Sequence, residues 1–231
     1  MRIRRSIVIL LGLIGGFLCG GLGAAHAESL SIRIGALIPR AQSDIWDLNI
    51  AETTFTRTQL IGGMLGAGID IFWSRWVNTS LFVYAYERDV DVEDRDFVYP
   101  DGTPIARTIT LNVVPIEMTL KFLPLGRMRR GAIPYLGGGV GLYIWKYHEI
   151  GDFVFDRFGD PFIDFDEFQA SGVEIGWHVL AGIQIRIGRR STLDFEIKYH
   201  DARGDMGRDF PGFNPIDLSG VSLLTGISFW W

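Results

Sequence analysis

Cysteine is almost absent from this sequence of 231 residues. The only one, Cys19, lies within the first 27 residues, so disulfides cannot stabilise the rest of the chain. A chain without disulfides must depend on its core, its backbone hydrogen bonds or its solvent. Cys19 is also a poor lipoprotein anchor, because Gly16, Phe17 and Leu18 do not resemble the small-residue box that lipoprotein processing prefers.

Long apolar runs are also missing after the N-terminal segment. No later stretch offers the ~18 uncharged apolar residues of a membrane-spanning helix, although 48% of the chain is hydrophobic and it contains seven Trp, seven Tyr and sixteen Phe. Stripes of Lys and Arg with interleaved aromatics are absent as well, so nucleic acid is not an expected partner. These absences exclude a helical membrane protein and leave a membrane β-barrel open.

The N-terminal segment has the order of a secretory signal. Three arginines within the first five residues precede an apolar run over residues 7–18, and the segment ends on the small residues Ala25 and Ala27. We therefore predict a signal peptide at residues 1–27, cleaved before Glu28, and a single domain over residues 28–231. The apolar run is shorter than the ~20 residues of a spanning helix, which disfavours an uncleaved anchor. Cleavage removes three positive charges and moves the formal net charge from −5 to −8.

The predicted domain consists almost entirely of segments in which apolar and polar residues alternate. Residues 193–200 are the clearest case, with Leu, Phe, Ile and Tyr on one face and Asp, Glu, Lys and His on the other. Alternation of period two is typical of β-strands, and apolar spacing of the helical kind is nearly absent. Eight such segments are predicted as strands: 30–39, 59–73, 78–90, 105–123, 133–147, 173–188, 191–203 and 219–231.

The connections between these segments alternate in length. Those after the second, fourth and sixth segments are short and the others are long, as expected for a closed barrel with periplasmic turns and extracellular loops. Two long connections keep alternating and are predicted as projecting hairpins, with turns at 100–103 and 158–161. In the fourth segment the apolar residues change face at Pro115, which predicts a bulge near Val114 and Pro115. The lipid face of segment 78–90 cannot be assigned.

We therefore expect an all-β fold, an antiparallel up-and-down transmembrane β-barrel of about eight strands. Alternation alone does not distinguish it from a soluble barrel with an apolar interior. The polar face favours the membrane barrel, because it combines glycines with nearly balanced charges that can pair inside a narrow barrel. The tryptophans favour it too, because they lie near segment ends, as in the aromatic girdles at membrane interfaces. The predicted polar network of the lumen comprises Arg33, Asp70, Glu117, Lys121, Glu174, His178, Arg186, Asp194, Glu196, Lys198 and His200.

Two further features are the glycine-rich segment PYLGGGVG at residues 134–141 and a last strand that ends on an aromatic residue. Together with the signal, they resemble small outer-membrane barrels of the OmpA and OmpW type, over essentially the whole mature chain. The resemblance implies residence in the outer membrane, contact with its lipids and lipopolysaccharide, and no cofactor. It also implies that Ile227, Phe229 and Trp231 belong to the signal that the barrel-assembly machinery reads, with Trp231 standing where Phe is usual.

His200 is the residue most suggestive of an enzyme. Outer-membrane lipid A deacylases resemble this chain in size and carry a His-x-Ser pair on a comparable strand, where the histidine activates the serine. Here Ala202 stands at the serine position and the alternation turns His200 inward, so we expect no enzyme activity. His178 and Glu174 share the inward face, but strand spacing gives no dense set of ligands, and no metal is expected there.

Acidic residues dominate the connection 149–167, which has Arg157 as its one basic residue. Such a patch could hold divalent cations among lipopolysaccharide phosphates, although it lacks the spacing of a calcium loop and solvated charge is the simpler interpretation. The leading hypothesis is a non-enzymatic barrel that braces the envelope or presents its loops at the surface, with a narrow passage for small solutes as a close variant. A lipid A-modifying enzyme and an adhesion or receptor barrel acting through its acidic extracellular loops are the alternatives.

Overall fold

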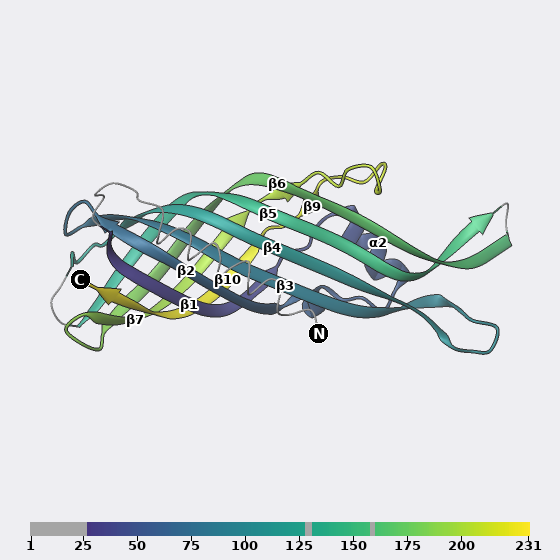
Figure 1. Ribbon diagram of the computed structural model, residues 1–231, viewed down its shortest axis with the longest axis horizontal. Helices are drawn as coiled ribbons and strands as arrows, with labels where there is room; N and C mark the ends of the chain where they lie inside the picture. The colour runs from purple at the N-terminus through teal and green to yellow at the C-terminus, as the bar shows by residue number, and fades with distance from the viewer. Residues whose placement is uncertain (1–26, 128–130, 158–159) are drawn as a thin grey trace.

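The computed structural model describes residues 27–127, 131–157 and 160–231, and eight of its strands close into one antiparallel barrel (Figure 1). The order around the barrel is β1, β10, β7, β6, β5, β4, β3 and β2, so that β1 and β10 meet and close the sheet. The predicted eight-stranded barrel is therefore confirmed. Its strands are β1 (Ala27–Pro39), β2 (Gly62–Phe72), β3 (Val77–Val98), β4 (Pro104–Phe122), β5 (Ala132–Arg157), β6 (Asp160–Arg186), β7 (Ser191–Asp201) and β10 (Gly220–Trp230).

The paired strands of the two predicted hairpins are present and extend the barrel wall well beyond the shorter strands, while the turn predicted at 158–161 includes residues 158–159, which lie outside the described part of the chain. Strands β3 and β4 stay paired as far as Val98 and Pro104, and β5 and β6 pair without interruption up to residues 157 and 160. In Figure 1 both hairpins project towards the right, at the end opposite the short turns. A small two-stranded sheet, β8 (Arg203–Gly204) with β9 (Ile216–Asp217), lies in the connection between β7 and β10.

The outer wall carries a belt of exposed aliphatic and aromatic side chains. Val140 is 51% exposed and Ile175 is 77% exposed, and both alternate along their strands with inward-facing residues. An exposed apolar belt around a closed barrel suits hydrocarbon rather than water as its solvent. Further members of the belt are Ile32, Ile34, Met118, Leu120, Leu142, Val179, Phe195, Ile197, Leu223 and Ile227.

The predicted bulge at Val114 and Pro115 is wrong. The register between β4 and β5 runs without a shift through Val113 opposite Trp145 and Pro115 opposite Tyr143. One face of β4 points inward over its whole length: it is apolar at Ile109 and polar from Glu117 onward. The apolar residues change face because the solvent outside the barrel changes, from hydrocarbon around the belt to water around the projecting hairpins.

The same change of outer solvent explains why the lipid face of segment 78–90 could not be assigned from the sequence. Phe82, Tyr84 and Tyr86 are buried inside the barrel, whereas Leu81 and Val83 alternate with them on the outer wall. Further along β3 the outward residues become acidic and exposed, with Glu87, Asp89, Asp91 and Glu93 on the outer face. The hydrocarbon belt therefore ends on β3 near residue 86.

A helical insertion that the sequence analysis did not predict fills the outer end of the barrel. It comprises α2 (Asp44–Glu52) and the 3-10 turn η1 (Arg57–Leu60), so the predicted strand start at residue 59 is also wrong. Trp46 of α2 stacks on Phe55 with ring centroids 5.7 Å apart and meets the edge of Tyr147 at 5.3 Å. We call α2, η1 and their connection, residues 44–60, the plug. In Figure 1 the plug lies at the base of the projecting hairpins.

The predicted signal peptide lies outside the described residues, apart from Ala27, which begins β1. Within the described part of the chain, no helix has the length and apolar character needed to span a bilayer.

Candidate functional site

Ion pairs between facing strands fill the middle of the barrel. Among the described residues, three close pairs cross the lumen with both side chains buried, and a fourth buried pair, Arg33 with Asp194, is longer at 4.0 Å. The distance from Arg33 Nη1 to Glu196 Oε2 is 2.7 Å, and that from Lys121 Nζ to Asp70 Oδ1 is 3.1 Å. The third pair joins Lys198 Nζ and Glu117 Oε2 at 2.6 Å. Alternating inward positions of β1, β2, β4 and β7 supply all six groups, because side chains of one parity share one face of a strand.

Hydroxyl groups donate further hydrogen bonds to each of these carboxylates, although Oε1 of Glu196 is buried without a partner in the described structure. Asp70 accepts hydrogen bonds from Ser29 at 3.0 Å and from Ser80. Tyr135 donates to Glu196 at 2.9 Å, and Tyr143 donates to Glu117 at 3.2 Å. A buried charge is tolerated when it has both a counter-charge and hydrogen bonds, and this network provides both.

Asp194 is held differently from the other interior carboxylates. It accepts hydrogen bonds from Thr192 at 2.9 Å and from Ser228, while its nearest cation, Arg33, lies 4.0 Å away. The guanidinium of Arg33 also lies 4.1 Å from the ring centroid of Phe82, so it contacts an aromatic face as well as two acidic groups. Rings and charges thus pack together, leaving side chains rather than open space at the barrel axis.

The two inward histidines have structural partners. His178 Nε2 lies 2.8 Å from Thr119 Oγ1, and His200 Nε2 lies 3.0 Å from the backbone oxygen of Leu218. His200 also stacks on Tyr143 at a centroid distance of 5.3 Å. The two histidines are directly opposite each other on β6 and β7, rather than across the barrel. Ala202, at the position where a deacylase would have serine, is buried and carries no nucleophile.

Two members of the predicted network lie apart from it. Glu174 is half-buried near Gly172, away from the three ion pairs, and Arg186 lies at the short-turn mouth of the barrel. The acidic segment 149–167 is not a loop but the paired end of β5 and β6, where backbone pairing spreads its carboxylates along a ladder. Within the described residues, no three His, Cys, Asp or Glu side chains come together as a metal site.

Sequence reasoning missed the contacts that hold the plug. Asn49 of α2 donates from Nδ2 to Glu149 at 2.8 Å and to the Tyr147 hydroxyl at 3.0 Å. Its Oδ1 accepts from Arg107 at 3.0 Å. The sequence does carry a signal for the plug: residues 109, 111 and 113 are apolar and face inward above the belt. An apolar interior there needs an apolar segment to cover it.

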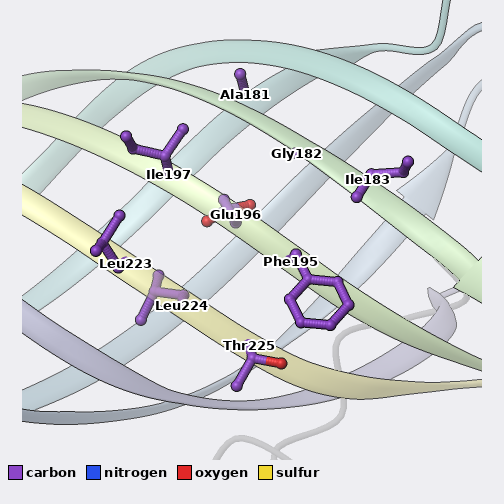
Figure 2. A pocket seen from close by; sticks show the side chains of 9 residues that line it. All are labelled: Ala181, Gly182, Ile183, Phe195, Glu196, Ile197, Leu223, Leu224 and Thr225. Carbon is purple, nitrogen blue, oxygen red and sulfur yellow. The ribbon is translucent and has the colours of Figure 1, made fainter.

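The outer wall carries a shallow hollow over β6, β7 and β10. Figure 2 shows Ile183, Phe195, Ile197 and Leu223 around it, on the side of the wall away from the lumen. The carboxylate of Glu196 points the other way, towards Arg33. The hollow is therefore part of the hydrocarbon-facing belt, and the charged network does not open into it. The predicted assembly residues are also exposed: Ile227 and Phe229 lie on β10, and Trp231 follows directly after it.

No protein-family model and no curated protein matches the chain. Among solved structures, it is similar to the outer membrane protein OprG from Pseudomonas aeruginosa, with a TM-score of 0.51 and 13% identity over 89% of this chain and 96% of OprG. It is also similar to a major outer membrane protein from Thermus thermophilus, with a TM-score of 0.47 and 11% identity over 89% of this chain and 100% of that protein. The similarity to Neisserial surface protein A has a TM-score of 0.46 and 13% identity over 88% of this chain and 96% of that protein. The similarity to OprG shows that the chain has the fold of a small outer-membrane β-barrel.

Proposed function

We propose that this chain, which has the fold of small outer-membrane β-barrels, is a non-enzymatic outer-membrane protein that holds two ordered ribbons at the cell surface. The observation that carries the proposal is the filled lumen: its charges pair with one another and are buried. A barrel of eight strands has room for side chains in its interior and little else. The barrel therefore acts as an anchor, and the parts available to the surroundings are the hairpins.

The two hairpins have the properties of a presented surface. Outward carboxylates on β3 are bonded across the ladder, with Thr108 donating to Asp91 at 2.7 Å and Thr110 donating to Asp89 at 2.7 Å. The plug packs against the inner side of the same strands. Long connections of outer-membrane barrels face the exterior, so the ribbons point away from the cell.

Conductance of the purified protein in planar bilayers tests the closed lumen. We expect no steady single-channel steps from the wild-type protein. The matched variant Arg33→Ala/Lys121→Ala/Lys198→Ala removes the three cations that fill the lumen and should conduct if it folds. Steady steps from the wild-type protein that persist after these cations are removed would favour the alternative of a narrow passage for small solutes and reject the anchor.

Cysteine labelling on intact cells tests the orientation. The predicted mature chain has no cysteine, so each introduced thiol is unique. An impermeant maleimide should label Asp101→Cys, in the β3–β4 turn, and should leave Arg189→Cys, in the β6–β7 turn, unlabelled until the outer membrane is permeabilised. The reverse pattern would reject surface presentation by the ribbons.

A further inference from the structure

Positive charge gathers at the end of the barrel opposite the ribbons. Within the described residues, the short turns and strand ends there carry five arginines, which we call the arginine rim: Arg75, Arg127, Arg186, Arg189 and Arg190. Glu28 is the one acidic side chain that the described chain exposes at this end, and it pairs with Arg127. The other end is acidic, so the molecule is strongly polarised along its axis.

Backbone hydrogen bonds join two of the rim's turns to each other and the third to the end of β10. Arg127 donates from its backbone N to the backbone oxygen of Arg75 at 2.7 Å, and Trp230 donates to the backbone oxygen of Arg190 at 2.8 Å. The guanidiniums are braced by rings: Arg75 lies 4.6 Å from the centroid of Trp76, and Arg127 lies 4.4 Å from that of Trp230. These contacts position the arginines without neutralising their charge.

Arg186 is the clearest uncompensated charge of the rim. Its guanidinium lies 5.5 Å from the centroid of the Trp230 ring, on which Arg127 also lies. Its Nε is buried and has no hydrogen-bond partner within the described structure. A buried donor without a partner, next to a second guanidinium, is a place where an anion would be stabilised.

Exposed tryptophans set the depth of the rim in the membrane. Trp73 is 71% exposed and Trp231 is 65% exposed, beside turns that carry Arg75 and Arg190. Exposed indoles mark the boundary between hydrocarbon and water. The connections β2–β3 and β6–β7 have four residues each, which is too short to carry the arginines beyond the headgroup layer. The chemical group at that depth is the lipid phosphate.

We infer that the arginine rim binds the phosphates of anionic phospholipids in the leaflet that the short turns face. The inference rests on the proposed membrane location and adds the lipid class and the residues. Arginine suits this ligand because its planar fork donates two parallel hydrogen bonds to phosphate oxygens. Basic clusters at the membrane surface attract acidic headgroups, and the attraction weakens as salt screens it.

The test counts the lipids that stay with the protein. The wild-type barrel is reconstituted in vesicles of phosphatidylcholine with a minority of phosphatidylglycerol, extracted gently, and analysed by native mass spectrometry. We expect retained phosphatidylglycerol to be enriched about fivefold or more over the bulk ratio, and the enrichment to fall as salt is raised. The rim variant Arg75→Gln/Arg189→Gln/Arg190→Gln should return to the bulk ratio.

A matched variant controls for net charge. Lys146→Gln/Arg203→Gln/Arg208→Gln removes three exposed positive charges at the other end of the molecule and should keep the wild-type enrichment. Equal enrichment in the rim variant and the wild type would overturn the inference. So would the absence of salt-sensitive enrichment in the wild type, and this second measurement needs no variant. Failure of the wild type to insert into any bilayer would instead overturn the proposed function.

Discussion

Lys198 is buried in the lumen and pairs with the carboxylate of Glu117, so removing that carboxylate is costly. We predict that Glu117→Gln, which leaves Lys198 buried without its counter-charge, lowers the free energy of unfolding by about 3–5 kcal/mol. The ammonium would keep its position 3.9 Å from the centroid of Tyr84, but a ring does not replace a carboxylate. Urea unfolding of the barrel in lipid vesicles measures the effect.

The double variant Glu117→Gln/Lys198→Met separates loss of the pair from loss of packing. Replacing both members of a buried ion pair by groups of similar size is often nearly neutral. The double variant should therefore recover most of the stability that the single variant loses. Equal destabilisation in both variants would show that shape, and not the charge left behind, determines the cost.

Two adjacent glycines of β5 differ sharply in the space around them. A Cβ at Gly139 would lie 1.9 Å from the backbone oxygen of Met118, whereas one at Gly138 would find nothing nearer than 3.5 Å. We predict that Gly139→Ala strongly reduces the yield of folded barrel and that Gly138→Ala does not. The shift in gel mobility between folded and heat-unfolded protein provides the measurement, and equal yields would contradict the prediction.

The inward parity of most lumen residues could be predicted from alternation, because a strand has only two faces. Partners could not be predicted, because they depend on register and on which strands face each other across the axis. Arg33 reaches Glu196 of β7, and no local pattern connects β1 with β7. Glu174 and Arg186 have the inward parity too, but they lie near the ends of the polar zone, where parity does not imply a partner.

At the scale of elements, the sequence predicted strands better than it predicted the plug. Strand existence follows from period-two alternation, which every one of the eight strands shows over part of its length. The helix α2 has nine residues, too few to be stable by propensity alone, and derives its stability from tertiary contacts. Two of those contacts come from Tyr147 and Glu149 of β5, which are distant from α2 in the sequence.

Trp46 should determine whether the plug stays seated. It is fully buried, so Trp46→Ala removes a large aromatic side chain from a packed site, a change that costs about 3–5 kcal/mol in protein cores. We predict faster amide hydrogen exchange over residues 44–60, with exchange in β1 and β10 unchanged. Leu48→Ala, at a site that is 38% exposed, is the matched control and should exchange like the wild type. Equal exchange in the Trp46 variant would contradict the seated plug.

A second element, the connection between β7 and β10, is fastened by Arg40 and Asp217. Arg40 Nε lies 2.8 Å from Asp217 Oδ2, and Nη2 lies 3.0 Å from Oδ1. Burial alone would raise the pKa of Asp217, but hydrogen bonds from Arg40, Ser219 and Gln42 hold this pKa below the ordinary value of 3.8. The carboxylate form is thus favoured in the folded protein.

The depressed pKa fixes the direction of a pH dependence. Stabilisation by the Asp217 carboxylate is fully present above pH 3.8 and is lost as the pH falls towards the lower pKa of the folded protein. We predict that acid lowers the protection of residues 205–218 against hydrogen exchange over this range, measured relative to the intrinsic exchange rate at each pH. Asp217→Asn should exchange faster already at neutral pH and should lose this acid response. An unchanged acid response in the variant would assign it to another group.

At the scale of the whole molecule, one barrel wall passes through two solvents. Around the belt the interior is polar and the outer face apolar; around the ribbons the interior is apolar and the outer face polar. If each strand had one polarity rule along its whole length, the change of face on β4 would need a bulge, which is why the bulge predicted there is wrong. The four strands of the two hairpins are the ones long enough to cross both zones, which explains why the alternation is clearest in the shorter β7.

The boundary between the zones can be located by placing one charge at two heights on the same outer face. Val179 and Gln169 both face outward on β6, within the belt and above it respectively. Arginine facing lipid costs about 2–4 kcal/mol at the bilayer midplane and about 0–1 kcal/mol near its edges. We therefore predict that Val179→Arg lowers the free energy of unfolding in vesicles by an amount in the first range and that Gln169→Arg changes it little. If both variants unfolded like the wild type, water rather than hydrocarbon would surround the belt, and the barrel would not be a membrane protein.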